Sequence, residues 1–235
     1  RWGGSLENRA RALLESVNAV RAAVGPEFPV GVKLNSADFQ RGGFDFTESL
    51  QVAKWLEAAG VDLLEISGGT YEQPRLLNVE GIEPIENQAI AQSTRAREAY
   101  FVDFAQAMRK ELTMPLMVTG GLRRLDAMES ALESGSADVV GIGRPMCVMT
   151  DAPKRLLAGM EQLPRYEDAL SLLPRWLKIL EKISLFKTLG TFAVQYWYYE
   201  QILLLGEQGK TSDDLSVFDA TRRQMKLAND LAAAR

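Results

Sequence analysis

The sequence contains no histidine and only one cysteine, Cys147. Histidine is the commonest acid–base residue of enzymes, so any chemistry of this chain either avoids histidine or obtains it from elsewhere. A single cysteine cannot form a disulfide within the chain, and its free thiol favours a reducing, cytoplasmic setting.

Strong charge and long apolar runs are also missing. The formal net charge is −4, so no basic field exists to attract nucleic acid or anionic lipid. No uncharged run approaches the roughly 20 residues of a membrane span, and no signal-peptide pattern opens the sequence. We therefore expect neither a nucleic acid nor a membrane as partner.

What is present resembles an ordinary globular domain, with 46% hydrophobic and 25% charged residues in 235. Short apolar segments alternate with segments of helical periodicity, and most of the apolar segments lack a polar alternation. Such strands are typical of a parallel sheet covered by helices on its faces. The fold class is therefore α/β. Strands are predicted at residues 29–34, 61–66, 114–118 and 137–142. Helices are predicted at residues 5–24, 47–59, 99–112, 126–134 and 152–160, and Thr47 can cap the second of them.

Two parts of the chain depart from this rhythm. Residues 68–93 have no clean period and are too long for an ordinary connection, which indicates a functional loop. Residues 161–235 read as two or three helices broken near Pro174, Gly190 and Gly206. They carry a Trp/Tyr cluster that we expect to dock these helices onto the rest of the fold or onto a partner subunit. In the last helix, Ala220, Leu227 and Leu231 can share one packed face. We expect an α/β domain over residues 1–160 and a helical extension over residues 161–235.

Glycine-rich turns follow the last two predicted strands. Gly120 and Gly121 follow the third, and Gly143 and Arg144 follow the fourth. Glycine lets the backbone approach a ligand closely, and amides at a helix start bind anions. In α/β barrels the corresponding loops commonly bind phosphate, and arginine has donors that match phosphate oxygens. The alternative, tight turns beside a solvated arginine, is weaker because two such turns lie on consecutive strands.

Lys33 interrupts the first apolar strand near its carboxyl end. A lysine is seldom buried without a partner, so Lys33 should face either an anionic ligand at the barrel mouth or an acidic neighbour such as Glu65. The residue types alone leave these two interpretations level.

Several motifs together resemble the old yellow enzyme or NADH:flavin oxidoreductase family. They begin with WGGSLENR at residues 2–9 and continue with GVKLN at residues 31–35 and GVD at residues 60–62. They end with SGG at residues 67–69, VTGG at residues 118–121 and GIGRP at residues 141–145. The order and spacing match over about residues 1–160, which form the carboxyl-terminal half of the family's barrel.

This resemblance implies a partial (β/α)8 TIM barrel, the carboxyl-terminal four βα units, with FMN at its mouth. Lys33 falls beside the flavin ring, and Gly120, Gly121, Gly143 and Arg144 fall on the loops that bind the FMN phosphate. NADH or NADPH is the implied electron donor, and an activated C=C bond, as in enones, is the implied acceptor. The resemblance thus implies a small-molecule substrate. The family's His/His or His/Asn pair and its tyrosine proton donor precede the matched region, so we expect no catalytic residue here and an inactive fragment that binds FMN poorly. No metal is implied.

Two rival interpretations stay open at this stage. In the first, the chain is part of another phosphate-binding barrel, either an FMN-linked 2-hydroxy acid oxidase or a lyase without flavin. Alternatively, it is a non-catalytic half-barrel that acts in assembly, because half a barrel exposes strand edges and can form homo-oligomers.

Overall fold

A computed structural model describes residues 1–38, 43–67, 102, 104–174, 177 and 183–233. The described residues form two compact units, which divide the chain between Ile142 and Gly143. The boundary expected at residue 160 remains a prediction. None of the described helices is long and apolar enough to cross a membrane.

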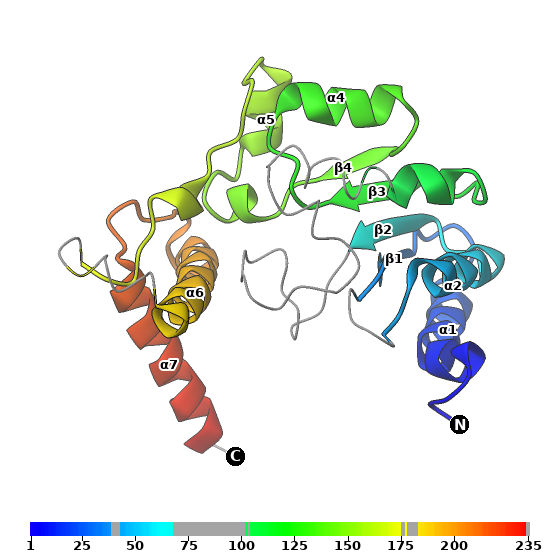
Figure 1. The fold of residues 1–235 in the computed structure, drawn as a ribbon, viewed down its shortest axis with the longest axis horizontal. Coiled ribbons are helices and arrows are strands. Elements are labelled where there is room, and N and C mark those ends of the chain that lie inside the picture. The colour runs from blue at the N-terminus through cyan, green and yellow to red at the C-terminus, as the bar shows by residue number, and fades with distance from the viewer. Residues whose placement is uncertain (39–42, 68–101, 103, 175–176, 178–182, 234–235) are drawn as a thin grey trace. The chain divides into compact units, whose positions relative to one another are not determined.

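The first unit is built on a four-stranded parallel sheet whose strands follow chain order. All four predicted strands are present, each beginning two residues later than expected. The α/β class with a parallel sheet is therefore confirmed (Figure 1). The strands are β1 Gly31–Asn35, β2 Leu63–Ser67, β3 Leu116–Thr119 and β4 Val139–Gly141.

Helices flank these strands and have clear sequence signals at their ends (Figure 1). The expected helix positions are confirmed within a few residues. In the third predicted helix, residues 99–112, the continuous helical stretch within the described residues is 104–109. The start of the second helix was wrong: Asp45, not Thr47, is its N-cap and accepts a hydrogen bond from the Glu48 amide at 2.8 Å. The bounds are α1 Leu6–Val24, α2 Phe46–Ala58 and α4 Leu125–Glu133.

The second unit is helical, as expected for most of its length. The predicted breaks at Gly190 and Gly206 are wrong, because α6 runs unbroken through both and ends at Gly209, which has a φ of 71°. A helical glycine costs only about 1 kcal/mol relative to alanine, less than the packing that α6 gains. Its elements are η3 Arg144–Cys147, α5 Ala152–Leu157, η4 Tyr166–Asp168, α6 Ser184–Gln208 and α7 Val217–Ala233.

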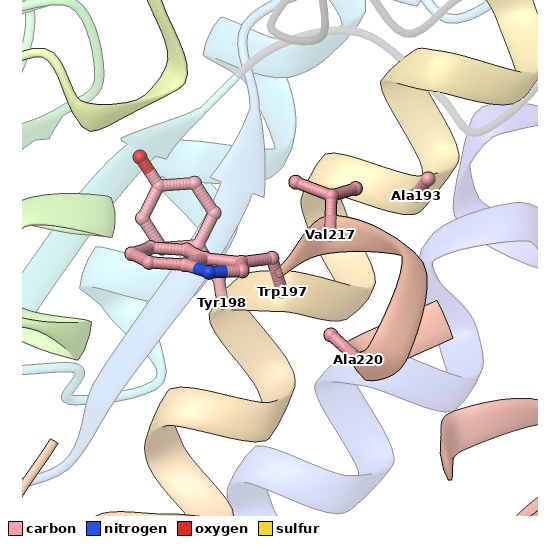
Figure 2. Packing of buried hydrophobic residues seen from close by; sticks show 5 residues of the cluster. All are labelled: Ala193, Trp197, Tyr198, Val217 and Ala220. Atoms are coloured by element: carbon pink, nitrogen blue, oxygen red, sulfur yellow. The ribbon is translucent and has the colours of Figure 1, made fainter. Parts of the chain in front are cut away.

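Aromatic residues of α6 form the core of this unit. Trp197 and Tyr198 pack edge to face, with ring centroids 5.2 Å apart, beside Val217 and Ala220 of α7 (Figure 2). Trp197 and Tyr198 therefore pack within the second unit, whereas Tyr199 is 42% exposed. The predicted docking onto the barrel or a partner subunit remains a prediction, and Trp176 lies outside the described residues.

The predicted shared face of α7 is wrong in its second half. Ala220 is fully buried, but Leu227 and Leu231 are 44% and 59% exposed. The spacing of these residues identified a helix face correctly, but it carried no information on how far the neighbouring helix extends along it.

Candidate functional site

The sheet of the first unit has one buried face and one open face. Leu64, Ile66, Leu116 and Val118 are at most 1% exposed and lie on the buried face. The opposite side chains are partly exposed in every strand. The open face is therefore where a ligand has access to the strands.

Lys33 lies on this open face and pairs with Glu65 across the register of β1 and β2. The Lys33 Nζ is 2.7 Å from Glu65 Oε1, so the ion-pair alternative from the sequence is present in the structure. The Lys33 side chain is still 54% exposed, and an ammonium has three donors. Its predicted role beside an anionic group remains a prediction.

The turn after β3 has the geometry expected from its glycines. Gly120 and Gly121 have φ of 120° and 79°, values that side-chain-bearing residues rarely adopt. Thr119 precedes them as the last residue of β3, and α4 begins at Leu125, four residues after Gly121. The strand, glycine turn and helix that the sequence predicted are all present.

Thr119 is a feature that the sequence interpretation missed. Its Oγ1 is buried and has no hydrogen-bond partner among the described residues. It points to Gly141, its register partner on β4: a Cβ on Gly141 would lie 1.8 Å from it. Unsatisfied buried hydroxyls are costly, and one at a strand end indicates a place for a ligand or water. The signal in the sequence was a threonine placed directly before the glycine pair.

Ser36 repeats this feature immediately after β1. Its side chain is fully buried, and its Oγ also lacks a partner within the described part of the chain. Its amide donates to the Ser67 carbonyl at 2.6 Å, which fixes it at the end of the paired region. Two unpaired hydroxyls therefore lie at the carboxyl ends of strands, the edge that carries function in α/β barrels.

Gly143 and Arg144 belong to the second unit. Gly143 precedes η3, and a Cβ built on it would meet nothing within 4 Å, so this turn is open. The Arg144 side chain is 38% exposed and its Nη1 lies 3.1 Å from Glu167 Oε1. Arg144 is thus neither a freely solvated charge nor buried out of reach of a ligand.

Cys147 at the end of η3 is an unsuitable nucleophile. Burial raises the pKa of its thiol, and the thiolate is the reactive form. We assign it to the packing of η3 against the aromatic core of the second unit.

The chain belongs to the NADH:flavin oxidoreductase / NADH oxidase family, whose sequence profile matches residues 1–162. An NADH-dependent flavin oxidoreductase of Talaromyces variabilis is 40% identical over 161 residues, covering 68% of this chain and 38% of that protein. The NADH oxidase of Thermoanaerobacter brockii is 32% identical over 162 residues, covering 68% of this chain and 23% of that protein. The chain therefore spans about two-fifths or less of the length of these relatives.

A solved relative confirms the barrel interpretation. The structure of 2-naphthoyl-CoA reductase in complex with 2-naphthoyl-CoA superposes with a TM-score of 0.56 at 31% identity, covering 71% of this chain and 23% of that one. This chain forms part of a (β/α)8 barrel of the old yellow enzyme type. The cofactors of this family are FMN and a reduced nicotinamide nucleotide, as the sequence predicted.

The described residues fit a phosphate-bearing flavin in three respects. In the first unit, the Gly120–Gly121 turn has positive φ angles, and the Thr119 hydroxyl is buried without a partner among the described residues. In the second unit, considered by itself, Arg144 is partly exposed. Glu65 and Glu167 oppose the two cations, which lowers but does not abolish their attraction for an anion.

Proposed function

We propose that this chain supplies the phosphate-binding side and one ring contact of the FMN site in an NAD(P)H-dependent flavin oxidoreductase. The observation that carries the proposal is the pairing of Thr119 with Gly141 in the sheet, which places two strand ends side by side. Each strand end leads into a glycine-containing turn, the first at Gly120 and the second at Gly143.

The roles of the residues follow from their chemistry. Backbone amides at Gly120 and Gly121 approach a phosphate without side-chain interference, and Arg144 supplies a charge whose fork matches two phosphate oxygens. Lys33 places a positive charge on the open face, where it favours a negatively charged flavin ring. When bound, FMN supplies a hydride relay between NAD(P)H and an acceptor such as an activated C=C bond.

The catalytic groups that act on the acceptor are proposed to lie outside these 235 residues. The chain contains no histidine, and the polar groups of the open face that carry the proposal, Lys33 and Glu65, form an ion pair with each other. We therefore expect weak FMN binding and no turnover by this chain alone.

Binding of FMN and riboflavin to the full chain tests the proposal, because the two differ only in the phosphate. Titration followed by flavin fluorescence, with ³¹P NMR of the FMN phosphate, detects weak binding. We expect Arg144→Gln to weaken FMN binding about tenfold or more, the size of a charged hydrogen bond, and to leave riboflavin unchanged. Lys33→Gln should weaken both ligands alike.

Arg155→Gln is the matched control, since Arg155 is an exposed arginine of α5 that pairs with Asp151 at 2.9 Å. Equal binding of FMN and riboflavin by the unaltered chain would contradict the phosphate site. So would an equal loss of FMN affinity in the Arg144 and Arg155 variants.

Assembly is a second candidate function, favoured by the outer strands of the sheet. Among the described residues β1 and β4 each pair on one side only, and Val139 is 40% exposed. Unpaired strand edges favour association. Size-exclusion chromatography at several concentrations measures this directly, and a monomer at every concentration would argue against it.

A further inference from the structure

The contact between Arg144 and Glu167 joins the family region to residues beyond it. The family match ends at residue 162, whereas Glu167 lies in η4 and its partner Tyr198 lies in α6. All three residues belong to the second unit. A residue of the shared barrel motif is thus paired by a segment that the family profile does not cover.

Glu167 is held in place from the side opposite Arg144. The Tyr198 hydroxyl donates to Glu167 Oε2 at 2.9 Å, while Oε1 faces Arg144 Nη1 at 3.1 Å. The Glu167 side chain is only 12% exposed, so its carboxylate has little freedom to turn toward solvent.

Tyr198 itself is fixed by packing. It is 4% exposed and lies edge to face against Trp197, whose indole nitrogen donates to the Leu215 carbonyl at 2.8 Å. Cys147 of η3 packs against the same cluster. The carboxylate is therefore positioned by the helical core and not by Arg144 alone.

We propose that Glu167 is a built-in competitor for the phosphate-binding guanidinium of Arg144, presented by the helical extension. This inference rests on the proposed phosphate site. Arg144 Nη1 already forms an ion pair with the carboxylate, so a phosphate must either displace Glu167 or bind the guanidinium beside a negative charge. Like charges at such short range oppose one another. The extension thereby lowers phosphate affinity and sets the occupancy of the flavin site.

Glu167→Gln tests the competition because it removes the charge and keeps the shape. We expect it to tighten FMN binding by up to about fivefold, the upper end for a partly exposed charge pair, and to leave riboflavin unchanged. Inorganic phosphate, followed by ³¹P line width, should show the same gain as FMN. Tyr198→Phe should produce a smaller gain, since it only loosens the carboxylate.

Asp168→Asn is the matched control. It makes the same charge change one residue away, but Asp168 pairs with Arg165 at 2.8 Å and not with Arg144. An equal gain in this control would overturn the proposal in favour of general electrostatics. Weaker or unchanged FMN binding by the Glu167 variant, confirmed as folded by circular dichroism, would overturn it too. If Glu167→Gln does not fold, Tyr198→Phe alone decides, and no gain there overturns the proposal.

A different result would contradict the proposed phosphate site itself. If Arg144→Gln leaves FMN affinity intact, the phosphate site itself is wrong, whatever Glu167→Gln does. If the site is right and the competition is real, Glu167→Gln has no effect in the Arg144→Gln background.

Discussion

Replacing Gly141 by alanine should destabilise the sheet of the first unit severely. The new Cβ would lie 1.8 Å from Thr119 Oγ1, 2.7 Å from Thr119 Cβ and 2.7 Å from Met117 Cε. Real Cβ atoms do not approach other atoms below about 3.0 Å. Met117 can move its flexible end, but Thr119 is held by its own strand, so the backbone of β3 or β4 must shift.

The expected cost is about 3 kcal/mol, the upper part of the range for overpacked cores. For a chain of this size that corresponds to a fall in Tm of about 6–12 °C. Urea unfolding and thermal unfolding, both followed by far-ultraviolet circular dichroism, measure the change.

Gly31→Ala is the matched control, because Gly31 is a strand glycine of the same sheet with room for a methyl group. The nearest atom to its Cβ would be the Leu63 carbonyl oxygen at 3.6 Å. We expect Gly31→Ala to be neutral or slightly stabilising. In the Thr119→Gly background, the further substitution Gly141→Ala should cost less stability than it does in the unaltered chain, because the obstructing side chain is gone. If Gly141→Ala were as stable as Gly31→Ala, the close approach of β3 and β4 would be refuted.

Three further predictions concern helix α6 and the sheet's supporting contacts. Gly190→Ala should stabilise the chain by about 0.5–1 kcal/mol in urea unfolding, because α6 is continuous there and nothing lies within 4 Å of the added Cβ. Gln201→Met should cost about 2 kcal/mol, since fully buried Gln201 binds both the amide and the carbonyl of Ser212, at 2.8 and 2.6 Å. The pKa of Glu57 is lowered, chiefly by the Thr113 hydroxyl, so its contribution is complete above its unfolded pKa of about 4.5. That contribution is lost as the pH falls through the folded pKa, and Glu57→Gln should flatten the acid side of a stability–pH profile.

Each of these has its own comparison. Gln208→Met changes an exposed glutamine at the end of α6 and should be neutral; a loss as large as that of Gln201→Met would contradict the bridging role. Glu15→Gln alters an exposed carboxylate of α1, and an equal flattening there would remove the case for Glu57. If Gly190→Ala destabilised the chain, the result would support the helix break predicted from the sequence and contradict a continuous α6.

Local chemistry made much of the fold predictable. Gly25 and Gly135 end helices with φ of 80° and 67°, where glycine is favoured. The apolar strands and the glycine turn at Gly120 were equally clear, because strand burial and positive φ leave direct traces in residue type. Asp45 was missed as the α2 cap because aspartate and threonine are both good caps, and only the geometry distinguishes neighbours.

What the sequence left open depends on distant contacts. The burial of Thr119 Oγ1 follows from its register with Gly141, 22 positions along the chain. Residue types predict that Thr119 and Gly141 lie at strand ends. They do not predict that the Thr119 side chain occupies the space where a Cβ of residue 141 would lie. The exposure of Leu227 and Leu231 likewise depends on where α6 crosses α7, which no periodicity within α7 contains.

The two cations expected to face FMN show why an ion pair and a ligand site are compatible. Lys33 and Arg144 each contact a carboxylate, yet their side chains remain 54% and 38% exposed. A half-buried cation without a partner is costly, so a binding cation needs a counter-charge whenever its ligand is absent. A carboxylate that made a closed, fully buried pair would exclude the ligand, whereas one that leaves donors exposed only competes with it. The increase in FMN affinity on Glu167→Gln therefore measures how strongly the Arg144–Glu167 ion pair opposes phosphate binding.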